Sequence, residues 1–268
     1  MILGIDIGST TTKAVSLESG KLLEKTQTEA IDPVTSSTGI IGKLTLENKI
    51  GINDIEEIVI TGVGASKIHD NIFNIPTKSI DEITAIGRGG LFSMRSNRMI
   101  IANVGTGTAF LEATSKGITH LGGIGVGGGT ICGLGKALLK KTELKNIMNL
   151  ASKGDINQID LLIGDIMENN LNFLNPETTA ANFGKLLDTA KDEDMALGIL
   201  TMVYQVIGML SVFAAKGKGY DTVVVTGNGS NNKIGQKVLK DISGIHNIKF
   251  QYPKDAEYVT AIGAALSA

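Results

Sequence analysis

The chain has 268 residues, with 25 Lys and Arg against 27 Asp and Glu, 34 Gly, one Cys and no Trp. A chain of this length buries a core without disulfide or metal staples. The single thiol, Cys132, excludes an intrachain disulfide, a Cys-rich zinc site and a four-thiolate iron–sulfur cluster. The net charge of -2 and the scarcity of aromatic residues argue against a nucleic-acid partner.

The first 28 residues predict three strands joined by tight turns. An apolar run over residues 1–7 leads into a Gly-Ser-Thr turn, a second strand over residues 11–18, a Ser-Gly-Lys turn and a third strand. A dinucleotide-binding fold or a P-loop protein would place a helix directly after its first glycine turn. The hairpin argues against both.

Helices and strands alternate along the rest of the chain, and Pro76 marks a predicted boundary between domains of residues 1–76 and 77–268. The apolar run over residues 197–215 is interrupted by polar and glycine residues, so we expect a helix buried between layers and no membrane span. The predicted helices cover residues 33–49, 79–94, 128–153, 159–168, 179–190, 193–216 and 259–267, and the further strands cover residues 57–61, 99–105, 109–114, 118–123, 222–226 and 246–252.

The chain also repeats itself. Residues 99–123 follow the same strand-turn pattern as residues 1–28, and Gly8 precedes Gly20 by the interval at which Gly105 precedes Gly117. A β-branched run closed by Thr-Gly-x-Gly occurs twice as well, ending at residues 64 and 229. Two Gly-rich hairpins can resemble each other through composition alone. We interpret the pattern as two related α/β halves.

Four segments pair glycine with small polar residues. Glycine lets a backbone amide approach an anionic oxygen, and hydroxyl groups add donors, so one such turn from each half would clamp a triphosphate. Any one of them is explained equally well as a simple hairpin closure. The segments are Asp6-Ile7-Gly8-Ser9-Thr10, Gly105-Thr106-Gly107-Thr108, Gly125-Val126-Gly127-Gly128-Gly129 and Gly227-Asn228-Gly229.

Asp6 and Lys13 add charge to the first turn. Asp6 ends an otherwise apolar strand, where a carboxylate is costly unless a cation or donor meets it. Mg²⁺ accompanying a nucleotide is the obvious candidate, either directly or through water. Lys13 lies on the returning strand, where it would reach a terminal phosphate or else be an ordinary exposed lysine.

A family resemblance combines these motifs. The chain contains, in order, the segments GIDIGST, IIANVGTGTAF, LGGIGVGGGTICGLG, TTAANFG and AIGAAL. In this order it resembles the bacterial type II pantothenate kinases of the actin, sugar-kinase and Hsp70 superfamily. The resemblance implies an α/β fold, namely a duplicated actin-like (ribonuclease H-like) two-domain fold with an interdomain nucleotide cleft. It also implies ATP-dependent phosphorylation of pantothenate, the first step of coenzyme A biosynthesis.

The same resemblance assigns roles to residues. Asp6, Gly8, Ser9, Thr10 and Lys13 would engage the phosphates and Mg²⁺, with residues 105–108 forming the facing phosphate and substrate loop. Residues 125–129 would lie beside the nucleotide, and residues 227–229 would border adenosine.

The family's general base is a glutamate that opens a helix after the first domain, and Glu82 matches it, with Asp81 as the fallback. Glu82 also completes a capping box with Ser79, which is a structural alternative.

One position departs from the family. His120 stands where relatives carry a pantothenate-binding arginine, and histidine offers no bidentate fork. Tyr252 is a further candidate substrate contact, and Thr106 would also contact the substrate. Another small alcohol therefore remains open as the acceptor.

Two other function classes compete with the kinase. Activators of radical dehydratases share the opening motif but bind a cluster through more than one cysteine per chain. A non-catalytic nucleotide-binding regulatory module is the other. We further expect a cytoplasmic homodimer that pairs through residues 138–216.

Overall fold

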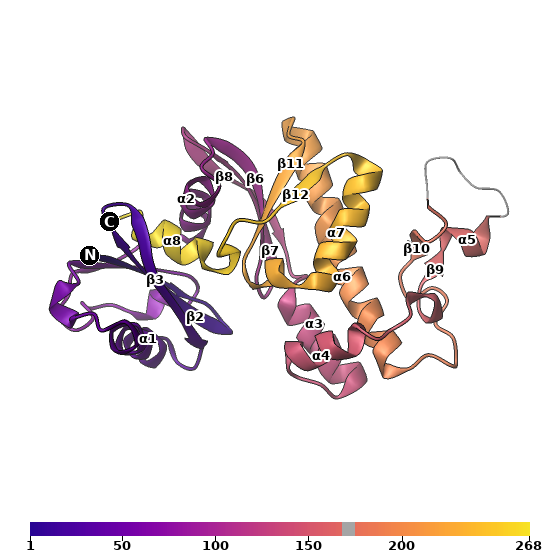
Figure 1. The fold of residues 1–268 in the computed structure, drawn as a ribbon, viewed down its shortest axis with the longest axis horizontal. Helices are drawn as coiled ribbons and strands as arrows, with labels where there is room; N and C mark the ends of the chain where they lie inside the picture. The colour runs from indigo at the N-terminus through magenta and orange to yellow at the C-terminus, as the bar shows by residue number, and fades with distance from the viewer. Residues whose placement is uncertain (168–174) are drawn as a thin grey trace.

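The computed structural model describes residues 1–167 and 175–268 of the chain, which form two five-stranded sheets flanked by helices (Figure 1). The first sheet has the order β3-β2-β1-β4-β5, and its strands are β1 (Ile2–Ile7), β2 (Thr11–Glu18), β3 (Lys21–Glu29), β4 (Glu57–Thr61) and β5 (Thr77–Ser79). The second sheet has the order β8-β7-β6-β11-β12, and its strands are β6 (Arg98–Val104), β7 (Thr108–Thr114), β8 (Gly117–Ile124), β11 (Thr222–Thr226) and β12 (Lys249–Gln251).

The two sheets share one topology. In the first sheet, β1 pairs antiparallel with β2 and parallel with β4, and β6 pairs in the same two ways with β7 and β11. Each sheet therefore consists of two hairpin-linked strands, a central strand and two parallel strands in matching order. The predicted duplication is confirmed, and so is the α/β fold class.

Local sequence explains the first hairpin and the helix that follows. β1 is rich in isoleucine and buried on both faces, as suits a central strand. Ser19 and Gly20 both adopt positive φ, which a tight hairpin turn between right-twisted strands requires. Helix α1 (Pro33–Asn48) starts with Pro at its first position, and the Asp32 side chain accepts hydrogen bonds from the amides of Val34 and Thr35.

Helices α2 (Glu82–Met94) and α8 (Val259–Ala265) cross between the two sheets. Each contacts the sheet of the other half: α2 packs on β6, β7 and β8, whereas α8 packs on β1, β2 and β4. The helices approach so closely that a Cβ on Gly89 would lie 1.9 Å from the Val259 carbonyl oxygen, and one on Gly263 would lie 1.7 Å from that of Ala85. Only glycine fits at these two positions.

The other face of the second sheet is covered by α6 (Asp192–Lys218) and α7 (Lys233–His246) (Figure 1). Within the described residues, α6 alone is long and apolar enough to cross a membrane, but 61% of its most apolar window is buried inside the protein. Burial of that extent is typical of a core helix. The core around it includes Ile199, Leu200, Val203 and Ile207.

The region between the second hairpin and α6 departs most from the predicted elements. The helix predicted over residues 128–153 is broken into α3 (Gly128–Leu134), a π-helical turn (Gly135–Leu139) and α4 (Leu144–Ala151), because Lys140 adopts positive φ. Of the helix predicted over residues 159–168, only α5 (Ile163–Ile166) forms, and position 168 lies outside the described residues.

The helix predicted over residues 179–190 is wrong. Thr179–Ala181 forms strand β10, which pairs with β9 (Leu161–Leu162), at the end of the molecule far from the first sheet (Figure 1). The Asp160 carboxylate is fully buried and accepts hydrogen bonds from the Thr179 hydroxyl, the Asn182 side chain and the Phe183 amide. These bonds hold the segment in a non-helical shape.

Smaller differences concern the ends of elements. Helix α7 and strand β5 were not predicted, and α7 occupies His246, which shortens the last strand to Lys249–Gln251. β5 pairs with β4 just beyond residue 76, and α8 packs on the same first sheet, so the predicted division at residue 76 stays a prediction. Short 3-10 turns complete the fold at Ile52–Asp54, Ala65–Lys67, Ile156–Gln158, Asn228–Asn231 and Ala256–Tyr258.

Candidate active site

A cleft of about 260 Å³ opens where the carboxyl ends of β1, β4, β6 and β11 meet. Ligands of α/β sheets bind characteristically outside the carboxyl ends of strands. Both halves of the chain contribute to its walls. The lining residues are Asp6, Gly8, Ser9, Thr10, Thr11, Lys13, Val63, Glu82, Asn103, Gly105, Thr106, Gly107, Thr108, Ala109, Gly227, Asn228 and Thr260.

The two predicted phosphate turns face each other across this cleft. The hydroxyl oxygens of Ser9 and Thr106, 97 residues apart in sequence, lie 2.8 Å from each other. A second link follows from Asn228, whose side-chain amide donates to the Thr11 hydroxyl at 3.1 Å. The first turn and the two glycine segments of the second half thus form one continuous polar surface.

Several donors in these turns have no acceptor within the protein. In the described part of the chain, no hydrogen bond is made by the backbone amides of Ser9, Thr10, Thr106 and Gly107. Gly8 differs, because its amide donates to the Thr11 carbonyl and closes the turn. Unclaimed amides from adjacent turns make an anion-binding concavity. The geometry suits phosphate oxygens.

Three charged side chains lie at the bottom of the cleft. Asp6 and Lys13 are partners in the β1–β2 register, so their side chains share a face, and both are buried. The pKa of Asp6 is raised to about 6, because burial and, to a smaller extent, the charge of Glu82 raise it more than the charge of Lys13 lowers it. Burial likewise lowers the pKa of Lys13 against the effect of Asp6, and raises that of Glu82 against the effect of Lys13.

The acidic pair fits a hard divalent cation. Asp6 and Glu82 line the same cleft, and burial disfavours the charge on each of them. The described residues contain no group of three His, Cys, Asp or Glu side chains able to cage a metal. Mg²⁺ does not require such a cage, since it is bound through one or two carboxylates together with water and substrate phosphates. The residues therefore fit a nucleotide-associated Mg²⁺.

Glu82 is the first residue of α2 and its side chain accepts no hydrogen bond from any described residue. The capping box with Ser79 is wrong, because Ser79 lies in β5 and the cap of the helix is Asp81. The Asp81 carboxylate accepts from the Thr84 amide at 2.8 Å and is not among the residues that line the cleft. The helix end is thus satisfied by Asp81, which leaves the Glu82 carboxylate free for chemistry.

The glycine run at residues 125–129 lies behind the second turn and does not line the cleft. The amides of Gly128 and Gly129 donate to the carbonyls of Gly105 and Thr106, both at 2.9 Å. A Cβ on Gly127 would lie 2.7 Å from the Thr106 carbonyl oxygen. The run supports the turn from behind, and the nucleotide contact expected of it stays a prediction.

Three other predicted site residues also lie outside the cleft lining. Gly229 accepts the Tyr204 hydroxyl on its carbonyl at 2.7 Å. His120 is exposed on the edge strand β8, opposite Leu111. Tyr252 packs against the core around α6, and its buried hydroxyl has no partner within the described residues. The structure does not bring these residues together with Glu82.

The motifs missed five residues that line the cleft, namely Thr11, Val63, Asn103, Ala109 and Thr260. A signal existed for Val63, which is the variable residue of the first Thr-Gly-x-Gly motif. Asn103 precedes the second turn and accepts the Thr226 hydroxyl on its side-chain oxygen at 2.9 Å. Thr260 comes from α8, a contact that no local pattern predicts.

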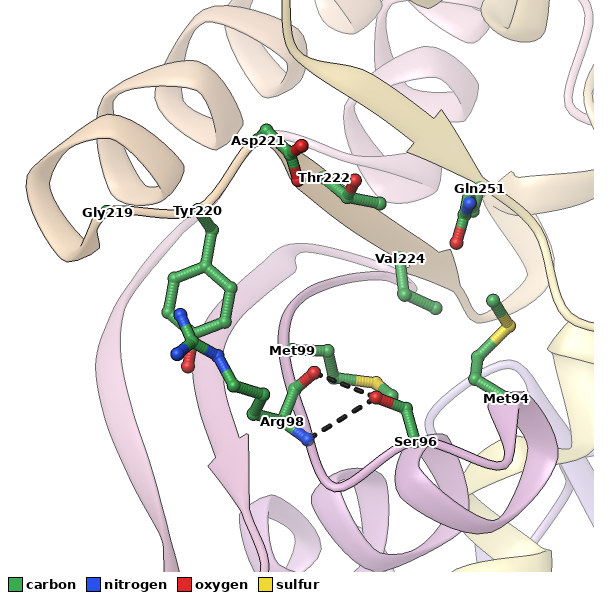
Figure 2. A pocket seen from close by; sticks show the side chains of 10 residues that line it. All are labelled: Met94, Ser96, Arg98, Met99, Gly219, Tyr220, Asp221, Thr222, Val224 and Gln251. Carbon is green, nitrogen blue, oxygen red and sulfur yellow. Dashed lines mark hydrogen bonds between the residues drawn. The ribbon is translucent and has the colours of Figure 1, made fainter.

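A larger cavity of about 750 Å³ lies at the opposite, amino ends of β6 and β11 (Figure 2). Its floor is apolar, with Met99 and Val224 side by side, and Arg98 stacks over the Tyr220 ring at 4.4 Å. Its lining has a single acidic side chain, Asp221, and a single glycine, Gly219, which ends α6. Size alone does not make it the active site, and the smaller cleft is the one that is lined by Asp6, Lys13, Glu82 and the glycine turns.

Comparisons with known proteins identify the family. A sequence model of the Fumble family matches residues 94–267. The type II pantothenate kinase of Staphylococcus aureus is 30% identical over 98% of this chain and 98% of its own length.

Solved structures support the fold. The activator of 2-hydroxyisocaproyl-CoA dehydratase from Clostridium difficile, with bound ADPNP, has a TM-score of 0.70 at 21% identity, covering 100% of this chain and 93% of its own. A ROK family glucokinase from Streptomyces griseus, in complex with glucose and AMPPNP, has a TM-score of 0.63 at 13% identity, covering 100% and 98%. These likenesses establish an actin-like ATPase and sugar-kinase fold. Taken with the family match and the nearly full-length identity, they show that the chain belongs to the Fumble family, the type II pantothenate kinases.

Proposed function

We propose that this protein transfers the γ-phosphoryl group of ATP to the primary hydroxyl of pantothenate, giving 4′-phosphopantothenate. One observation carries the proposal: two amide-rich turns from the duplicated halves meet in a single cleft that also contains the unpaired carboxylate of Glu82. Membership of a kinase family and the nucleotide analogues named for two fold neighbours support ATP as the donor.

The turns and Lys13 would hold the triphosphate. Phosphoryl transfer depends on in-line placement and on neutralising charge over the phosphate oxygens. The free amides of Ser9, Thr10, Thr106 and Gly107 are donors for those oxygens, and Lys13 supplies a positive charge between them. Asp6, with Glu82 nearby, would hold Mg²⁺, which when bound neutralises phosphate charge. Gly227 and Asn228 would border the adenosine.

Glu82 would act as the general base. Its carboxylate accepts the proton of the acceptor hydroxyl as that oxygen forms a bond to the γ-phosphorus and the bond to the β-phosphate oxygen breaks, releasing ADP. A buried carboxylate of raised pKa is a stronger base than an exposed one. Its place on the first turn of a packed helix fixes it at the cleft wall.

The location, the oligomeric state and the acceptor complete the proposal. The cytoplasm is the proposed location, in keeping with the bacterial metabolic kinase that it resembles. The homodimer would use the region of residues 138–216, where Leu138 and Phe213 expose apolar side chains. Pantothenate itself is proposed from the family, and because His120 lies outside the cleft lining, another small alcohol is the alternative acceptor.

The test is a coupled assay with ATP, Mg²⁺ and pantothenate. Glu82→Gln should lower kcat by roughly 10²–10⁴-fold while leaving ATP binding intact, because it removes the base and keeps the side-chain volume. Asp81→Asn is the matched control. Its side-chain oxygen can still accept from the Thr84 amide, so the helix cap is kept and the variant should retain most of the activity. Equal losses from both variants, or no turnover of pantothenate by the unaltered protein, would refute the assignment.

A further inference from the structure

Val63 is an unexpected residue in an otherwise polar cleft. Among the cleft-lining residues of the described chain, only Val63 and Ala109 are apolar side chains, and Val63 alone is larger than a methyl group. Its side chain is 66% exposed, although the neighbouring strand β4 is almost entirely buried. An apolar side chain this open at the wall of a polar cleft is available to contact a bound molecule.

The backbone on both sides holds Val63 in place. Gly62 adopts a φ of +87°, and a Cβ there would lie 2.6 Å from the Asp6 carboxylate and 2.7 Å from the Ile7 carbonyl oxygen. A Cβ on Gly64 would lie 2.3 Å from the Ile7 side chain, and the Gly64 amide donates to the Ile7 carbonyl at 2.9 Å. The loop is therefore clamped against the end of β1, and Val63 is presented to the cleft.

This position is close to the proposed chemistry. Gly62 touches the Asp6 carboxylate, and Asp6 lies near enough to Glu82 to be influenced by its charge. A molecule whose hydroxyl group approaches Glu82 would bring its adjoining carbon atoms towards the loop at residues 62–64. The valine side chain of that loop offers those atoms an apolar contact and no hydrogen bond.

We propose that Val63 determines acceptor specificity by packing against a branched apolar carbon beside the reacting hydroxyl. The inference rests on the proposed function and deepens it. In pantothenate, the carbon next to the primary alcohol carries two methyl groups, which match a fixed β-branched side chain. The site thereby selects a hindered alcohol over a simple straight-chain alcohol or water.

The experiment compares two acceptors. Pantothenate and N-(2,4-dihydroxybutanoyl)-β-alanine, which lacks the two methyl groups, are assayed with the unaltered protein and with Val63→Thr and Val63→Ala. Valine and threonine have the same shape, so Val63→Thr changes polarity alone and should reduce the preference for pantothenate in kcat/KM roughly tenfold, with Val63→Ala reducing it about threefold. Turnover of the analogue and the KM for ATP should change less than about twofold.

Val34→Thr is the matched control, since Val34 is 53% exposed on α1 and does not line the cleft. The ratio of kcat/KM values should be unchanged in this variant. An unchanged ratio in both Val63 variants overturns the inference, as does an equal loss for both acceptors. If the unaltered protein turns over neither acceptor, the proposed function itself fails, and this outcome is distinct from an unchanged preference.

Discussion

Asp6 is the clearest case of a residue retained against the stability of the fold. Its carboxylate is 9% exposed, and Lys13 across the β1–β2 ladder does not compensate fully for the lost hydration, because the pKa of Asp6 rises to about 6. The unsatisfied charge is useful if Mg²⁺ arrives with the nucleotide, since the cation supplies the missing partner. The ionised carboxylate that the proposed function needs at this position therefore lowers the stability of the ligand-free protein.

Asp6→Asn should stabilise the ligand-free protein at pH 8 and abolish its kinase activity. The folded state holds the Asp6 proton more tightly than the unfolded state, whose pKa is 3.8, so the ionised form destabilises the fold above pH 6. One pKa unit corresponds to about 1.4 kcal/mol, so the gain should be at most on the order of 2–3 kcal/mol, because the buried Lys13 loses its partner charge in the variant. The gain should fade as the pH falls from about 6 to about 4.

Urea unfolding of both proteins across this pH range measures the effect. A constant difference in the free energy of unfolding between pH 8 and pH 4 would contradict the account. So would a loss of stability at pH 8.

Sequence patterns predict site residues well where chemistry and local backbone coincide. Asp6 lies near the end of a strand, Ser9 and Thr106 lie in turns, and Glu82 starts a helix; all four line the cleft. His120 does not line the cleft. Its position depends on how an edge strand lies relative to α2, which no local pattern specifies. Thr260 was missed for the same reason, since α8 reaches the cleft only through the crossing of two distant helices.

The α2–α8 crossing is the element that joins the two halves. α2 starts with Glu82, and α8 packs on β1, which contains Asp6. A Cβ on Gly4 in β1 would lie 2.1 Å from the Ala261 carbonyl oxygen, so the strand and the helix are in close backbone contact. The distance between the two carboxylates is thereby fixed by backbone contacts between elements.

Gly263→Ala should therefore destabilise the protein by about 3 kcal/mol or more, because the new methyl group overlaps the Ala85 carbonyl, which has no free direction to move. Gly39→Ala is the matched control. Gly39 lies inside α1 with nothing within 4 Å of an added Cβ, and its substitution should stabilise by about 0.5–1 kcal/mol.

Chemical denaturation gives both values. Equal changes in the free energy of unfolding for the two substitutions would show that the α2–α8 crossing can shift to accommodate the added methyl group. The activity of Gly263→Ala, measured below its unfolding transition, should also fall, since α2 must shift and Glu82 with it.

Element prediction succeeded where the pattern is local. Alternation and β-branched content indicated β1, β2, β4 and β11, whereas the helix predicted over residues 179–190 failed. That segment is shaped by the buried carboxylate of Asp160, and a long-range network of side-chain bonds cannot be read from periodicity. The break at Lys140 is similarly set by the packing of α3 and α4 around α6.

At the scale of the whole molecule, the duplication explains why both halves of the chain contribute a glycine turn to a single cleft. Each five-stranded sheet ends in a glycine turn at the same topological position, and the crossing helices place the two turns face to face. The links between Ser9 and Thr106 and between Thr11 and Asn228 span the two sheets. A phosphate chain bound between them would contact both halves at once.

Nucleotide binding should therefore stabilise the molecule as one unit. At a concentration about 100 times its Kd, a nonhydrolysable ATP analogue with Mg²⁺ should contribute about 2.7 kcal/mol and raise the Tm of a single transition by roughly 5–10 °C. Thr106→Val keeps the side-chain shape but removes the hydroxyl group of the second turn. It should leave the Tm without nucleotide nearly unchanged, because the Ser9–Thr106 hydrogen bond is exposed, and should reduce the nucleotide-induced rise by about half.

Thr119→Val provides the comparison for this whole-molecule test, because Thr119 is exposed on β8 of the same sheet and does not line the cleft. It should retain the full rise in Tm, measured by differential scanning calorimetry at matched nucleotide concentration. Two separate transitions, of which only one responds to nucleotide, would mean that the halves melt independently and that the ligand contacts one of them. A full rise in Thr106→Val would remove the Thr106 hydroxyl group from the binding site, whereas a halved rise with one transition would support contact of both sheets with the same phosphate chain.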